Sequence, residues 1–209
     1  MRLKICMLIF LFILSGCNIE SEETNVPPEN LEPTSIKLTP IDLFDGEAGK
    51  FKNFLGSMSG GIKLEYEGSK PNASLDIDIW ENGKKVDTAG SIGDLFYSLD
   101  EQKRSNEVEI IISIDTVNFE GQNEYSIIKV NKVRNSGSSL STVTLPWNKE
   151  LTLRGVLQHT EPHSFSVELP VNVFGMQATR SNQISTADLS EESLAETEWA
   201  LVFTLRFDD

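Results

Sequence analysis

Cysteine, histidine and basic residues are all scarce in this 209-residue chain. It has two cysteines and two histidines, and 18 Lys and Arg stand against 32 Asp and Glu, for a net charge of −14. Two cysteines cannot make a disulfide-stapled scaffold. Two histidines leave little material for a histidine-based metal site or catalytic triad. Because a surface this acidic repels phosphate, we expect no nucleic-acid partner.

The apolar run at the N-terminus is too short to cross a membrane. It covers residues 5–14, whereas a transmembrane helix needs about 20 apolar residues. Arg2 and Lys4 precede the run, and Leu14-Ser15-Gly16-Cys17 follows it. A basic start, a short apolar stretch and small residues in this order are typical of a secretion signal.

The segment Leu14-Ser15-Gly16-Cys17 resembles the lipobox of bacterial lipoproteins. The resemblance implies that residues 1–16 are a signal peptide, removed after the Cys17 thiol receives a diacylglyceryl group. It also implies an extracytoplasmic protein of the cell envelope, anchored to the bacterial membrane by acyl chains such as palmitate. Two acyl chains suffice for stable anchoring. Cys6 leaves with the signal peptide, so the mature chain would have no free thiol.

Residues 17–35 are expected to form a tether after the lipidated cysteine. They contain five glutamates, three prolines and no basic residue. Such a segment has too little apolar surface to form a core, so we expect it to be disordered. Residues 36–209 are long enough for one domain with a core of its own.

Alternating apolar and polar residues predict strands through most of this domain. The strongest run is 199–207, where Trp199, Leu201, Phe203, Leu205 and Phe207 would share one face. We expect an all-β, antiparallel sandwich of about eight or nine strands, with a closed barrel as the alternative. One or two short helices are expected at residues 188–196, capped by Ser185 or Thr186, and at 51–58. The other predicted strands are 62–66, 75–79, 108–114, 125–130, 140–145, 151–154 and 165–169.

Asn82-Gly83 lies between two alternating segments and predicts a two-residue type I′ hairpin turn. The turn would pair Trp80 with Lys85, Ile79 with Val86, and Asp78 with Asp87. The predicted core side then holds Leu75, Ile77, Ile79 and Val86. The predicted outer face, our candidate ligand-binding site, holds Asp76, Asp78, Trp80, Lys85 and Asp87.

This outer face permits several interpretations. Asp78 opposite Asp87 would be destabilising, because like charges in cross-strand pairs repel. Water could screen the pair, or Lys85 could balance it. If the pair is merely repulsive, Asp78→Asn should stabilise the domain. The two carboxylates could instead share a cation such as calcium, weakly and with help from Asp76. A Trp80–Lys85 cation–π pair and the carboxylates could also form a surface for a sugar or a peptide.

No catalytic set is apparent, and we assign no catalytic residue. The chain has no G-x-S-x-G elbow, no P-loop and no G-x-G-x-x-G segment. His159 and His163 are four residues apart, but Pro162 between them disfavours a helix. We therefore expect solvated histidines in a hairpin loop in preference to a zinc or copper site.

The sequence accordingly favours a non-enzymatic, lipid-anchored binding or interaction domain, with an envelope protein or carbohydrate as partner. The alternative is a hydrolase of a cell-envelope polymer that uses a carboxylate pair, for which Asp76, Asp78 and Asp87 are the candidates. No cofactor is expected beyond weakly bound calcium.

Overall fold

The computed structural model describes residues 35–67, 72–96, 106–118 and 124–207. The expected signal peptide, the lipidation site Cys17 and residues 17–34 of the expected tether lie outside the described residues. Within the described ranges, no helix has the length and apolar character needed to cross a membrane.

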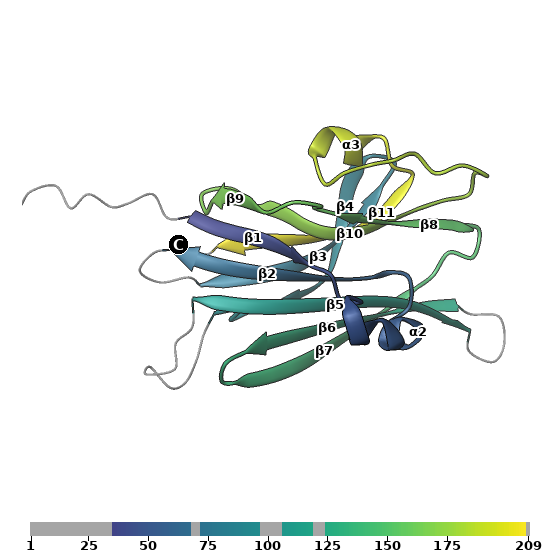
Figure 1. Cartoon of the computed structure of the whole chain (residues 1–209). Coiled ribbons are helices and arrows are strands. Elements are labelled where there is room, and N and C mark those ends of the chain that lie inside the picture. The colour runs from purple at the N-terminus through teal and green to yellow at the C-terminus, as the bar shows by residue number, and fades with distance from the viewer. Residues whose placement is uncertain (1–34, 68–71, 97–105, 119–123, 208–209) are drawn as a thin grey trace, which may run out of the picture. The chain divides into compact units, whose positions relative to one another are not determined.

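Two antiparallel sheets face each other and form a sandwich (Figure 1). The six-stranded sheet has the order β7-β6-β5-β2-β1-β9, and the five-stranded sheet has the order β4-β3-β11-β10-β8. The strands of the first sheet are β1 (Ser35–Ile41), β2 (Ser59–Glu67), β5 (Glu107–Asn118), β6 (Glu124–Arg134), β7 (Gly137–Pro146) and β9 (His163–Ser166). Those of the second are β3 (Ala73–Glu81), β4 (Lys84–Ile92), β8 (Leu153–Gln158), β10 (Val171–Thr179) and β11 (Trp199–Phe207).

The expected all-β sandwich is confirmed, and the sheets do not close into a barrel. The described residues form eleven strands, because the sequence pattern did not identify β1 and β10. In β1, Pro40 ends the short alternation of Ile36 and Leu38. In β10, a register shift between Asn172 and Phe174 breaks the alternation.

The main core fills the space between the two sheets, and β11 lies at the centre of the five-stranded one. Leu201, Phe203 and Leu205 are fully buried in this core, as the alternation predicted. The opposite face of β11 is also buried. There a second apolar cluster forms beneath residues 187–194, with Leu157, Leu189, Leu194, Ala200 and Val202 as its buried members.

Three short helical segments are present among the described residues. The 3-10 turn η1 (Gly46–Phe51) runs into α2 (Lys52–Leu55), close to the expected helix at 51–58. The helix α3 (Glu191–Ala195) lies over the five-stranded sheet (Figure 1). Its N-cap is Ser190, whose hydroxyl accepts from the Ser193 amide, so the expected caps Ser185 and Thr186 were wrong.

Two predictions near residue 160 also need correction. The segment between His159 and Pro162 is not a hairpin loop, because β8 and β9 belong to different sheets. The predicted strand 165–169 ends at Ser166, and Leu169 is 71% exposed. The chain therefore crosses from one sheet to the other here, and its side chains are free to line a groove.

Candidate functional site

The hairpin of β3 and β4 has the predicted turn but a different register. Asn82 and Gly83 have positive φ angles of 50° and 75°, as a type I′ turn requires. Gly83 is also packed so closely that a Cβ there would lie 2.0 Å from the Ala195 carbonyl oxygen. Trp80 pairs with Lys85 as predicted.

Beyond this pair, two bulges in β4 shift the register. Asp87 pairs with Ile79, and Thr88 pairs with Asp78. The predicted pairing of Asp78 with Asp87 is therefore wrong, and so is the core position of Val86, which is 54% exposed. Each bulge places one extra residue in β4 and re-aims the side chains that follow.

Asp78 is a buried, fully paired carboxylate, with only 1% of its surface exposed. Its Oδ1 lies 2.7 Å from Lys85 Nζ and accepts from the Thr88 hydroxyl at 2.8 Å. Its Oδ2 lies 3.0 Å from the Thr204 hydroxyl and 3.5 Å from a guanidinium nitrogen of Arg206. Burial raises the pKa of Asp78, but the hydrogen bonds from Lys85, Thr88 and Thr204 outweigh it and hold the pKa below its usual range.

The other predicted site residues have separate surroundings. Asp76 binds Arg206, with 2.7 Å between Oδ2 and Nε. Asp87 is exposed and accepts from the Thr88 amide. Trp80 packs against the second apolar cluster, and its buried Nε1 has no hydrogen-bond partner among the described residues.

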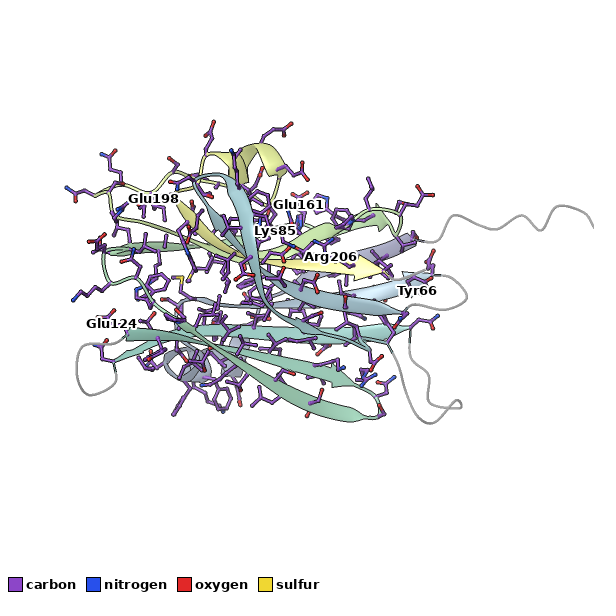
Figure 2. All side chains as sticks on the ribbon, turned by 180° about the vertical axis from the view of Figure 1, so that it is seen from behind. Tyr66, Lys85, Glu124, Glu161, Glu198 and Arg206 are labelled. Carbon is purple, nitrogen blue, oxygen red and sulfur yellow. The ribbon has the colours of Figure 1, made fainter. Side chains whose placement is uncertain are left out.

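Lys85 directs its ammonium group to Asp78, so the cation–π pair expected with Trp80 is replaced by an ion pair. Lys85 and Arg206 come from β4 and β11 and lie near each other on one face of the sheet (Figure 2). The predicted outer face thus becomes an ion cluster around the buried Asp78, with Lys85 and Arg206 partly exposed. A cation such as calcium would have to displace Lys85 and Arg206 to reach Asp78.

A chain of polar contacts runs from this cluster to Asn172 at the start of β10. The Thr204 hydroxyl lies 3.0 Å from both Asp78 Oδ2 and Asn172 Oδ1, and its single hydrogen serves one of them at a time. Asn172 Nδ2 donates to the Leu189 carbonyl at 3.1 Å. The Asn172 carbonyl lies 3.0 Å from His159 Nε2. Asn172 therefore ties together two segments that are far apart in the sequence.

These two segments form the walls of a groove of about 680 Å³. One wall consists of the end of β8, of β9 and of the start of β10, and the other of residues 188–191. His159, His163 and Phe165 contact one another on the first wall with tilted rings, whose centroids are 5.0–6.0 Å apart. His159 also lines a smaller hollow of about 430 Å³ beside residues 40–44.

The opposite wall carries the carboxylates of Asp188 and Glu191. Hydrogen bonds from the Ser190 hydroxyl and amide hold the pKa of Asp188 below its usual range, and the nearby His159 acts in the same direction. Asp188 is therefore negatively charged at neutral pH. Leu169 stands exposed at the rim. The groove combines an aromatic wall with an anionic wall.

Two histidines four residues apart could suggest a metal site, but they need further ligands. Within the described ranges, no group of three or more His, Cys, Asp or Glu side chains has a geometry that could hold a metal ion. The exposed His163 contacts both His159 and Phe165 with its ring tilted.

Sequence reasoning identified the two histidines but missed the groove. Asp188 and Leu189 come from the segment before α3, and Asn172 comes from a strand that was not predicted. No local spacing connects these residues, so only the folded structure brings them together.

Comparison of the chain with models of known protein families, with the curated proteins and with the solved structures finds no match. The groove must therefore be interpreted from its own chemistry.

Proposed function

We propose that this protein is a lipid-anchored binding domain of the bacterial cell envelope that holds its ligand in the groove. The lipobox-like segment ending at Cys17 supports the anchor and the extracytoplasmic location. One observation carries the binding role: aromatic rings and two carboxylates line the same groove, and Asn172 contacts a residue of each segment.

The chemistry of the walls favours a ligand with a positive charge beside an apolar group. Asp188 and Glu191 attract a cation, and aromatic rings such as Phe165 also attract cations at their faces. A protein segment that presents a Lys or Arg side chain has this combination, because its long aliphatic stem packs on apolar surface while the charged head stays polar. We therefore propose an envelope protein segment as the partner.

The surroundings of the candidate carboxylates favour this binding role over a polymer hydrolase. A general acid needs a raised pKa near the working pH, whereas the pKa of Asp78 is lowered. Asp76 and Asp78 both contact Arg206 inside the ion cluster. They are suited to stabilising the sheet that supports the groove.

A photo-crosslinking amino acid at Leu169 tests the groove in intact cells. We expect an adduct on the purified protein, detected by intact mass spectrometry, because Leu169 is exposed at the rim. The matched control carries the same group at Val86, an exposed apolar residue on β4 away from the groove. Equal adduct formation at the two positions would contradict a specific groove ligand.

The anionic wall is tested in the same assay. Asp188→Asn with Glu191→Gln should reduce the Leu169 adduct several-fold, because the cation loses its counter-charges. Glu196→Gln removes an exposed carboxylate at the C-terminal end of α3 and should leave the adduct unchanged. If the adduct survives the double change and forms with a neutral partner, the ligand is not cationic. The proposal that the groove binds a ligand would then still stand.

The anchor is tested by Cys17→Ala. The resemblance predicts that the variant is released or remains unprocessed, because the acyl acceptor is lost. Cys6→Ala is the control, since Cys6 lies within the apolar run and should not affect lipidation. If Cys17→Ala is cut and retained at the membrane like the wild type, the lipoprotein interpretation is wrong.

A further inference from the structure

The six-stranded sheet ends in a long, uncharged edge strand, β7. No charged residue occurs between Arg134 and Lys149. Among the described residues, the backbone of β7 pairs with β6 and with no other strand. Every second residue of such an edge presents a free N–H and C=O, which can pair with a further strand.

The other three edge strands carry features that block such pairing. β4 has Lys84, Lys85, Asp87 and two bulges, β8 has six residues including Arg154, and β9 has only four residues. Charge, bulges and short length are the usual protections of natural sheet edges. β7 has ten residues, no charge and no bulge. Its only protective feature is Pro146 at its end.

Most side chains of β7 are exposed among the described residues. Leu140 is 64% exposed on the solvent face of the strand. β4 lies close to β7 at Val143, since a Cβ at Gly90 would lie 3.4 Å from Val143 Cγ2. Val143 packs against the core, so this contact involves the inner face of β7.

We propose that β7 pairs in antiparallel fashion with β7 of a second copy of this chain, across a two-fold axis at Thr142. A two-fold interface sets one strand against itself, so a charge at or beside the axis would lie near its own copy. An uncharged strand avoids this repulsion. The chain as a whole carries a net charge of −14, which repels a second copy, and β7 itself contributes no charge.

The side chains fit this register. Thr142 faces Thr142 of the second copy, and Leu140 faces Thr144 of the second copy on the solvent side. On the inner side, Ser141 faces Val143 of the second copy. Threonine pairs are favourable cross-strand neighbours. The pairing also covers Leu140, which is exposed in the single chain.

Cysteine cross-linking tests the register in the full-length chain in its own membrane. Directly opposed residues of antiparallel strands have Cα atoms about 4.5–5.5 Å apart, which is within disulfide range. We therefore expect Thr142→Cys to give a disulfide-linked homodimer on mild oxidation. The unchanged chain, which contains Cys6 and Cys17, sets the background.

Thr144→Cys on the same strand is the matched control. In the proposed register, residue 144 of one chain and residue 144 of the other are four residues apart along the strand, about 13 Å. The two cysteines should therefore not cross-link. Leu140→Cys combined with Thr144→Cys restores a facing pair and should cross-link. Thr142→Lys should abolish self-association in detergent, measured by sedimentation, without lowering the melting temperature.

Three results would overturn the proposal. Thr142→Cys could fail to cross-link although the variant melts like the wild type. Thr144→Cys alone could cross-link as well as Thr142→Cys, which would indicate random collision. Thr142→Cys could also cross-link to a different polypeptide, in which case β7 receives a strand from another protein.

Discussion

Asp78→Asn should destabilise the domain, and the structure explains the direction. Both carboxylate oxygens receive donors: Lys85 and Thr88 at Oδ1, and Thr204 and Arg206 at Oδ2. An asparagine amide must place its NH₂ on one of these two sides. The threonine hydroxyls can turn to accept, but Lys85 and Arg206 only donate. Either orientation therefore leaves a cation facing a donor.

The expected loss in unfolding free energy is about 2–3 kcal/mol. Removing one partner of a fully buried ion pair costs about 3–5 kcal/mol. The loss is smaller here because the Lys85 and Arg206 side chains are 36% and 35% exposed and water can solvate them. For a domain of this length, the melting temperature should fall by about 5–10 °C.

Calorimetry on the purified protein, with urea unfolding as a second measure, checks the expected loss. Asp87→Asn is the matched control, because Asp87 is exposed and accepts only a local amide hydrogen bond; it should stay within about 0.5 kcal/mol of wild type. An unchanged or raised stability of Asp78→Asn would refute the reasoning, since it would mean that Asp78 is repelled in the fold and not paired. A rise in wild-type melting temperature with calcium, absent in Asp78→Asn, would instead indicate the cation site.

Three further predictions follow from the same contacts. The pKa of Asp78 is lower in the folded state than its value of about 3.9 in an unfolded chain. The ionised Asp78 therefore stabilises the fold fully above about pH 3.9, and this contribution is lost as the pH falls through the folded-state pKa. Urea midpoints of wild type and Asp78→Asn should therefore converge below about pH 4. Phe203→Ala should lower the unfolding free energy, measured with urea, by about 3–5 kcal/mol. Phe54→Ala, at an 81% exposed position, should lower it by less than about 0.5 kcal/mol. Ser190→Ala should lower the unfolding free energy by about 1 kcal/mol through loss of the α3 cap.

The strand faces could be predicted where alternation is unbroken. Leu201, Phe203 and Leu205 lie in the core because a period of two assigns one face to each residue. The Asn82-Gly83 turn was also predictable, since both positions have positive φ. These features depend on neighbours along the chain, and the sequence encodes them directly.

The bulges and the groove depend on contacts between distant segments. The bulge at Val86 shifts Asp87 by one position, so a register extrapolated from the turn alone holds for the pairs Glu81–Lys84 and Trp80–Lys85 and then fails. The segment before α3 buries the outer face of β11, although alternation suggests a solvated face there. Leu169 continues the alternation of Phe165 but stands exposed, because β9 ends at Ser166.

The corrected register also changes how charge relates to the proposed binding. With Asp78 opposite Asp87, the carboxylates would be surface groups available to a ligand. With Asp78 opposite Thr88, Asp78 pairs with Lys85 and Arg206, and its Oδ2 and Asn172 Oδ1 share the Thr204 hydroxyl. Asn172 then holds both walls of the groove. The ion cluster would thus act on binding by positioning, so its substitution should weaken the groove and the fold together, whereas Asp188→Asn, at an exposed wall residue, should weaken binding alone.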